Sequence, residues 1–480
     1  MLDEQIDVEG EFWLPGLPDK KTPGNLTVDR DGTANLKLVD YVSGDWNSYF
    51  STTNLPAGSL IPPMRIVGVA HSVGSVTLDN CYAKSLRMVF GMSTPVNYAV
   101  GRVLTGAIYE ENEEMELNEL QFNVEGLDDW VGVSGFTLGN SDDFSKIWVN
   151  YTAPDDINLM KTEDLSIDIV FSWQHPGWSL TQTEATVKQT ALIQLKTPTP
   201  KPFSELLRIG QRVRDFVSLG IGRNVLITQM SGFLDTFGRE LDDGSFHRQP
   251  LKFYFRDPRR RDSETVPIRA NMLLDFAATQ GSGVSHLSTW LESYTKHDGP
   301  ISSFFKVFEA HSVELADRFL DLFQVAETLH KQTSSEKKMS RVDLSARVRS
   351  INEAFADDQP FAEILAEAFR RTNELSARER LERVFTDHLD FEVDEETINE
   401  VCAAIARTRA KLTHEAGANN VEVIMGHNVW EKAHALDAII RIWLLKLSGF
   451  DNDAILASLR RKPELREALT EIFHIEDVED

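Results

Sequence analysis

The chain has 480 residues, 41% hydrophobic and 26% charged, so it is long enough for two or three folded domains and is neither disordered nor collagen-like. Its 49 basic and 75 acidic side chains give a net charge of −26, which argues against binding nucleic acid or anionic membranes through bulk charge. Any contact with phosphates must be local. With only two cysteines, Cys81 and Cys402, the sequence predicts no disulfide framework and fits a reducing cytoplasm.

The sequence predicts no targeting segment and no membrane partner. Residues 1–4 carry no basic region followed by an apolar stretch, so no signal peptide is expected. The apolar segment 438–447 is short and is interrupted by Arg441 and Lys446, whereas a bilayer core needs about 20 apolar residues. We therefore expect a protein that stays in the cytoplasm.

The first 200 residues favour antiparallel β structure. Apolar side chains alternate over 165–173, and the apolar segments 26–28 and 36–38 flank Asp31-Gly32, a dipeptide suited to a hairpin turn. We expect a sandwich or barrel over residues 1–200, in which the second hundred carry a net charge of −12. The proline-rich stretch 196–202 then predicts a stiff connector that ends the ladders.

Beyond the connector the pattern becomes mixed and then helical. Over 203–304 we expect a helix at 205–217, strands near 225–227 and 251–255, and a helix around Trp290. Over 305–480 the apolar period of 3.6 residues predicts a helical bundle, with helices at 313–332, 343–355, 361–373, 376–388, 395–412, 428–448 and 452–460. The fold class is therefore an α+β multidomain chain, with domains expected at 1–200, 203–304 and 305–480.

Common catalytic signatures do not occur in the sequence. It contains no phosphate-binding G-x-x-x-x-G-K-[ST], no H-E-x-x-H and no G-x-S-x-G motif, which disfavours ordinary nucleotide hydrolases and zincins. Two E-x-x-H pairs, Glu327/His330 and Glu431/His434, raise the alternative of a carboxylate-bridged metal pair. Helical phase places the second pair away from its apolar stripe, and Glu431 is better explained by a capping box with Asn428. We predict no metal and no cofactor.

The helix predicted at 395–412 carries an unusual arginine. Arg409 lies about 40° from Ile405, inside the apolar stripe, and burying a guanidinium costs several kcal/mol unless it is paired or lines a polar cleft. His414 follows where Gly417 predicts the helix has ended, so it can return to the same cleft. Arg407 lies on the opposite side of the helix.

Two interpretations of these residues remain open. Glu327 and His330 fall on the apolar face of the 313–332 helix, so a carboxylate is available there to hold Arg409. Alternatively, Arg409 is a structural ion pair, His414 a residue favoured by the C-terminal end of the helix dipole, and Glu327 with His330 a polar pair of their own.

Several segments, in this order along the chain, resemble a known family. They are 12–16 (FWLPG), 23–27 (PGNLT), 31–32 (DG), 76–81 (VTLDNC), 326–330 (AETLH) and 409–414 (RAKLTH). The sequence resembles the ApeA family, bacterial anti-phage effectors with a β-rich N-terminal domain and a C-terminal Apea-like HEPN ribonuclease domain. The resemblance covers most of the chain.

The resemblance implies a function and site residues. It implies a metal-independent endoribonuclease in abortive infection that leaves a 2′,3′-cyclic phosphate, with RNA, transfer RNA included, as substrate. Arg409 and His414 would be the catalytic pair of the R-x4-6-H motif, supported by Glu327 and His330. It also implies a homodimer through the HEPN domain and a phage-derived trigger.

Local charge and composition complete the expectations for this site. Arg407 and Lys411 add positive charge next to the pair and are expected to contact RNA. Ala410 departs from the polar residue common after the motif arginine. A second candidate function is therefore a non-catalytic RNA-binding or assembly protein with a decayed site. A third, a carbohydrate-binding sandwich, rests on three tryptophans that are better explained as core aromatics, Trp13, Trp130 and Trp173.

Overall fold

The computed structural model describes residues 5–42, 63–86, 95–177, 181, 183–257, 266–280, 285–309, 314–389, 391–414 and 427–474. The chain forms two compact units. The first, called here the β-rich unit, contains Met1–Ile221, Val225–Arg269 and Asp275–Ala277, and the second, the helical unit, contains Gly222–Asn224, Ala270–Leu274 and Ala278–Asp480. The three domain ranges expected from the sequence stay a prediction.

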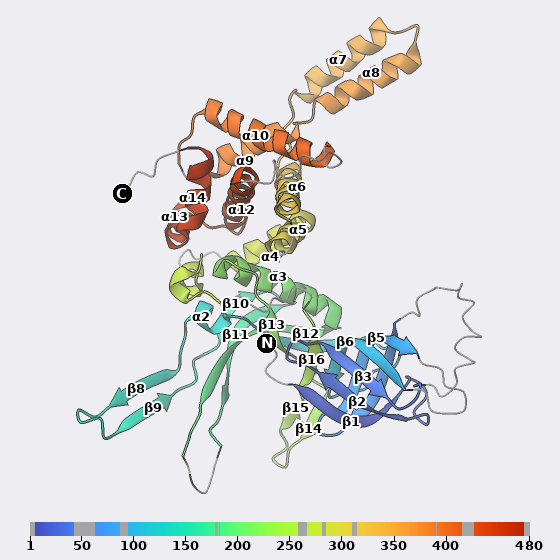
Figure 1. The fold of residues 1–480 in the computed structure, drawn as a ribbon, viewed down its shortest axis with the longest axis vertical. Coiled ribbons are helices and arrows are strands. Elements are labelled where there is room, and N and C mark those ends of the chain that lie inside the picture. Colours follow the sequence, from blue (N-terminus) through green and yellow to red (C-terminus); the bar gives the residue numbers. More distant parts are fainter. Residues whose placement is uncertain are drawn as a thin grey trace. The chain divides into compact units, whose positions relative to one another are not determined.

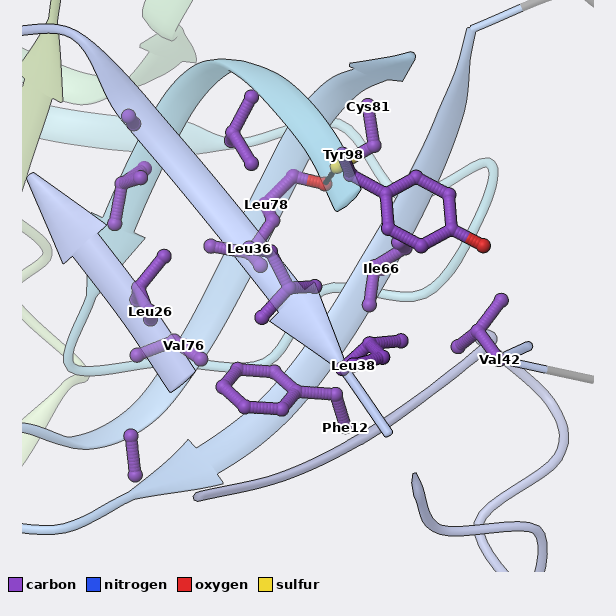
Figure 2. Packing of buried hydrophobic residues seen from close by; sticks show 14 of the residues in the cluster. Phe12, Leu26, Leu36, Leu38, Val42, Ile66, Val76, Leu78, Cys81 and Tyr98 are labelled. Atoms are coloured by element: carbon purple, nitrogen blue, oxygen red, sulfur yellow. Dashed lines mark hydrogen bonds between the residues drawn. The ribbon is translucent and has the colours of Figure 1, made fainter. Parts of the chain in front are cut away.

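The β-rich unit opens with a closed barrel of six antiparallel strands (Figure 1). The strands follow the order β6-β3-β2-β1-β4-β5, and β5 pairs back with β6. They are β1 (Ile6–Trp13), β2 (Thr22–Val28), β3 (Ala34–Leu38), β4 (Met64–Ala70), β5 (Gly74–Leu86) and β6 (Val96–Thr105). Figure 2 shows the apolar interior, where Phe12, Leu26, Leu36 and Leu78 are fully buried. Side chains at alternate positions of each strand point into the barrel, and the apolar ones fill its interior.

The hairpin predicted around Asp31-Gly32 is confirmed. β2 and β3 pair antiparallel from Val28↔Ala34 to Gly24↔Leu38. Gly32 adopts a left-handed φ of 80°, which favours glycine, and the carboxylate of Asp31 accepts a hydrogen bond from the backbone N–H of Thr33 at 2.8 Å.

Beyond the barrel the same sheet continues in the order β6-β16-β13-β7-β12-β11-β10. These strands are β7 (Glu116–Val124), β10 (Ile157–Lys161), β11 (Ser166–Gln174), β12 (Lys188–Pro202), β13 (Ile227–Phe233) and β16 (Leu251–Phe255). The helix α3 (Phe203–Ile221) packs on β12 and β7, next to the short helix α2 (Leu127–Val131). Two separate hairpins are β8 (Phe136–Asn140) with β9 (Ile147–Tyr151), and β14 (Gly238–Glu240) with β15 (Phe246–Arg248).

The predicted connector at 196–202 is wrong, because these residues form the second half of β12. Up to Lys196 the strand lies between β11 and β7, and after an irregularity it pairs again with β7 at Lys201 and Pro202. β11 begins at Ser166, opposite Lys196, so the prolines follow where the neighbour on that side has ended. Proline is tolerated on such an open edge because no ladder hydrogen bond is required of it there.

The expectation that three tryptophans fill cores holds for two of them. Trp130 and Trp13 are 2% and 8% exposed, whereas Trp173 near the end of β11 is 54% exposed. The prediction is wrong for Trp173 because the alternation that buries Ile169 and Phe171 ends with Ser172, after which β11 is exposed on both faces.

The helical unit is a bundle around the long helix α12 (His427–Leu447), which packs against α4, α6, α9, α13 and α14 (Figure 1). Nearly every position of α12 from Val429 to Leu445 is buried, so neighbouring elements cover this helix on most sides, and its charged residues Lys432, Asp437 and Arg441 are buried with the apolar ones. The other helices are α4 (His286–Lys296), α5 (Asp298–Glu309), α6 (Leu315–Thr333), α7 (Arg341–Ala354), α8 (Gln359–Thr372), α9 (Ala377–His388), α10 (Glu395–His414), α13 (Asn452–Arg461) and α14 (Pro463–Ile472).

These helices confirm the predicted bundle, and α5 and α14 are additions to it. α9 begins at a capping box in which Ser376 and Glu379 exchange hydrogen bonds. Within the described ranges, no helix is both long and apolar enough to cross a membrane.

Candidate functional site

The helix that carries the predicted catalytic residues is α10. Its first turn is capped by Asp394, whose carboxylate accepts hydrogen bonds from the backbone N–H of Thr397 at 2.9 Å and from its hydroxyl at 2.7 Å. These bonds hold the pKa of Asp394 below its usual value. One face of α10 is buried against α9 and α6 through Ile398, Cys402 and Ile405. The apolar stripe predicted from the sequence is therefore confirmed.

α10 continues to His414, two residues beyond the predicted end, and the expected return of His414 from an irregular backbone is wrong. The hydroxyl of Thr413 donates a hydrogen bond to the carbonyl of Arg409 at 2.7 Å. A threonine side chain commonly bonds the carbonyl four residues earlier in a regular helix. At 100° per residue, positions 409 and 414 lie about 140° apart, whereas positions 407 and 414 lie only about 20° apart. Position 414 therefore shares a helix face with Arg407. The side chain of His414 lies outside the described residues.

Arg409 and Arg407, which stand at the spacings x4 and x6 before His414, occupy different environments. Arg409 is half-buried, and its guanidinium carbon lies 5.8 Å from the ring centroid of Phe323 on α6, a cation–π contact. Arg407 is exposed, and so is Lys411 one turn further on. The helical phase predicted for both arginines is confirmed, because half-buried Arg409 lies on the face toward Phe323 of α6, whereas Arg407 is exposed on another face of α10.

Glu327 and His330, predicted to support the catalytic pair, have other partners on α6 and α9. The half-buried carboxylate of Glu327 forms an ion pair with Lys331 Nζ at 2.5 Å, one turn along the helix. His330 is 4% exposed, and its Nδ1 lies 3.4 Å from Nη1 of Arg380. Burial, and then the positive charge of Arg380, lower the pKa of His330. Their support of the catalytic pair stays a prediction.

Lys432 on α12 is the site residue that the sequence analysis missed. It is only 8% exposed, and its Nζ donates to the hydroxyl of Thr408 at 3.0 Å and to the side-chain oxygen of Asn428. Asn428 is therefore not the predicted N-cap, because α12 begins one residue earlier, at His427. Position 432 lies about 80° from Ile440 around the helix, at the border of the apolar stripe. This phase is the only indication in the sequence that Lys432 is partly buried.

The charges around Lys432 disfavour its protonated form. Burial lowers its pKa, Glu431 raises it, and the positive charges of Arg407 and Lys411 lower it again. The net effect is a pKa below the ordinary value for lysine. Lys432 of α12 is thus a buried cation beside two exposed cations, Arg407 and Lys411, which share one side of α10.

A groove of about 890 Å³ runs along this side of α10, between that helix, the start of α12 and the residues that end α14. Three of its acidic side chains, Glu395, Glu396 and Glu400, belong to the first turns of α10. Arg407 lines it further along α10, and Glu431 and Lys432 line it from α12. Along α10 the charged lining therefore changes from carboxylates to an arginine.

The described residues contain no group of three or more His, Cys, Asp and Glu side chains close enough to hold a metal ion. In the second E-x-x-H pair, the ring of His434 packs on Trp430, with centroids 4.1 Å apart. His330 is thus held against Arg380 of a neighbouring helix, whereas half-buried His434 contacts Trp430 of its own helix.

The fold and the motif together define a class of protein, a β-rich N-terminal region followed by a helical HEPN domain. The family model described as ApeA N-terminal domain 1 matches residues 7–290, and the one described as Apea-like HEPN matches residues 320–454. Because the first match covers more than half of the chain, the protein belongs to the ApeA family. Comparison with curated proteins and with solved structures gives no match. This architecture supports a HEPN nuclease-type role in anti-phage defence in general.

Proposed function

We propose that this protein is an endoribonuclease of anti-phage defence, which cuts RNA at the end of α10 without a metal ion. The observation that carries the proposal is that the HEPN match at 320–454 includes α10, whose last turns place Arg407, Lys411 and position 414 on one side of the helix. A local basic patch of this kind is what a chain with a net charge of −26 needs to bind RNA.

The reaction follows from the chemistry of a histidine and an arginine. His414 accepts the proton of the RNA 2′-hydroxyl, whose oxygen forms a bond to the adjacent phosphorus. The bond from phosphorus to the 5′-oxygen breaks, and that oxygen receives a proton from the protonated imidazole of His414 or from a water molecule. The products are a 2′,3′-cyclic phosphate and a 5′-hydroxyl. An arginine stabilises the negative charge that grows on the non-bridging oxygens, because its guanidinium offers a planar fork of donors.

Two arginines compete for this role. Arg409 has the shorter spacing to His414 and was preferred from the sequence because of its place in the apolar stripe. The regular helix up to His414 favours Arg407 instead, because it shares the face of position 414 and lines the groove. We propose Arg407 as the phosphate ligand and retain Arg409 as the alternative that mutation must test.

The proposal extends to the assembly and control of the enzyme. Two copies would meet through their HEPN domains, so that two motifs act on one RNA, and the β-rich unit would respond to a phage-derived trigger. Cells carrying the full chain should then show cut RNA, transfer RNA included, only after phage challenge. Mapping the new RNA ends in challenged and unchallenged cells tests substrate and trigger together.

The direct test of cleavage uses the purified full chain, a labelled RNA and excess EDTA. We expect cleavage to persist, the 3′ ends to be cyclic phosphates, and His414→Ala to lower the rate by about 100-fold or more. Arg349→Gln, an exposed arginine on α7, is the matched control and should cut like the parent. A His414→Ala variant that cuts as well as the parent contradicts the proposal. A parent that binds RNA but never cuts it favours the RNA-binding or assembly function instead.

A further inference from the structure

We propose that Lys432, Arg407 and Lys411 form a phosphate-binding site for single-stranded RNA, in which Lys432 of α12 positions the phosphate backbone. The inference rests on the proposed function, because it names the part of the same site that holds the substrate. It adds a residue from a second helix, about 20 residues beyond the R-x4-6-H motif.

Lys432 is a buried cation. The residue is 8% exposed, and the hydrogen-bond partners that hold its ammonium group are a hydroxyl and an amide oxygen, those of Thr408 and Asn428. Removing a charge from water is costly unless an opposite charge compensates it. The nearby carboxylate of Glu431 opposes this cost only in part, because the pKa of Lys432 is still lowered.

The surrounding charges identify an anion as the missing complement. Arg407 and Lys411 both act on Lys432 through their positive charge, although they belong to a different helix. On α10 they lie four residues apart, about 40° around the helix, and therefore on one face. Three like charges gathered at one place repel one another, and an anion bound among them relieves that repulsion.

The groove indicates the kind of anion. Its volume is about 890 Å³, and along α10 its lining extends from Glu395 to Arg407, so it has space for several groups rather than for a single small ion. Glu395, Glu396 and Glu400 repel a polyanion from one end of the groove, whereas Arg407 and Lys432 attract it at the other, where the carboxylate of Glu431 opposes them only in part. A strand of RNA would therefore be held at the end of α10 where position 414 lies. Lysine binds phosphate as a point charge, and arginine as a fork, so the two residues supply different contacts.

The test measures binding without cleavage. The probe is a fluorescein-labelled single-stranded 2′-O-methyl RNA, which lacks the attacking hydroxyl, and its anisotropy is followed with the full chain between 50 and 200 mM KCl. The variants are Lys432→Gln, Arg407→Gln and Lys411→Gln, with Arg349→Gln on α7 as the matched control. We expect each of the three to weaken binding by about tenfold and to lower the salt slope by about 0.7, the value for one phosphate contact of a single strand. The control should stay within about twofold of the parent.

The outcomes separate this inference from the proposed function. If Lys432→Gln folds, as circular dichroism reports, and binds within twofold of the parent, the inference is overturned, whether or not the parent cuts an all-ribose RNA. If binding depends on Lys432 and the parent does not cut, the inference stands and the proposed function fails. Arg407 and Lys411 are exposed, so their variants test the site even if Lys432→Gln unfolds, and unchanged binding in both also overturns it.

Discussion

The two units differ in how they bury charge. In the β-rich unit, Asp79 of β5 is 7% exposed and lies between two arginines, with Arg65 Nε and Arg102 Nη2 each 2.7 Å from its carboxylate. In the helical unit, Lys432 is about equally buried, yet its hydrogen-bond partners are neutral, and the one nearby negative charge that acts on it, Glu431, is opposed by the positive charges of Arg407 and Lys411.

This difference separates charges that serve the fold from charges that serve a ligand. A buried ion with its counter-ions in place is complete within the protein, and removing one partner destabilises it. A buried cation among cations is incomplete, so its removal should cost little stability and much affinity. The comparison therefore predicts which substitutions affect folding and which affect RNA binding.

The largest effect is expected for an apolar residue of the barrel core. Leu36 is fully buried in the cluster shown in Figure 2, and Leu36→Ala should lower the free energy of unfolding by about 3 kcal/mol, through lost apolar burial and the cavity left behind. Amide hydrogen exchange of the barrel strands measures this change. RNA affinity of the folded variant should equal that of the parent, and a selective loss of affinity would break the division between the units.

A somewhat smaller effect is expected for the paired charge. Asp79→Asn removes the negative charge between Arg65 and Arg102, whose side chains are 15% and 27% exposed, so water compensates them only in part. We expect the free energy of unfolding of the barrel to fall by about 2 kcal/mol, measured by hydrogen exchange of β5 amides. Unchanged protection in β5 would show that the pair contributes nothing to the fold.

The helical unit should be sensitive to acid through His388 on α9. Burial, followed by the charges of Lys446 and His330, lowers the pKa of His388 from 6.5 to about 3. The unfolded chain therefore binds more protons between these values, and stability is lost as pH falls below 6.5. Between pH 7 and pH 5 the parent should lose about 2 kcal/mol more than His388→Phe, a variant that keeps an aromatic ring against Trp443. Parallel pH profiles for the two proteins, measured by thermal unfolding, would contradict this prediction.

The smallest change in stability is expected for substitution of Lys432, and it should not be a loss, unlike the change expected for Asp79→Asn. Because the pKa of Lys432 is lowered, the unfolded chain binds more protons above the folded-state pKa, and stability should rise with pH through that window. Lys432→Met at neutral pH should therefore leave the melting temperature unchanged or raise it, in contrast to Asp79→Asn. A melting temperature lowered as much as in Asp79→Asn would make Lys432 a structural residue.

Much of this fold could be predicted from periodicity. The hairpin at Asp31-Gly32, strand β11 and most helices of the bundle follow from apolar periods of 2 and 3.6 residues. The prolines of 196–202 misled the prediction, because tertiary pairing on one side of β12 tolerates them. α14 was missed although Pro463 stands at its first turn, a position where proline starts helices rather than breaking them.

The candidate site was only partly predictable for a physical reason. The phases of Arg407 and Arg409 follow from one helix and were found from the sequence. The contact of Lys432 with Thr408 joins residues of two helices that lie 24 positions apart along the chain, and no local sequence pattern predicts such a pairing. The partners of Glu327 and His330, Lys331 and Arg380, likewise depend on packing.

We propose that one face of α10, which carries Arg407 and position 414, cuts RNA. The most direct measurement compares cleavage rates of one labelled RNA by the full-length parent, Arg407→Ala and Arg409→Ala at saturating protein. We expect Arg407→Ala to lower the rate by about 100-fold and Arg409→Ala by less than about tenfold, because only Arg407 shares the face of position 414. The reverse order, or equal rates in all three proteins, would contradict this account.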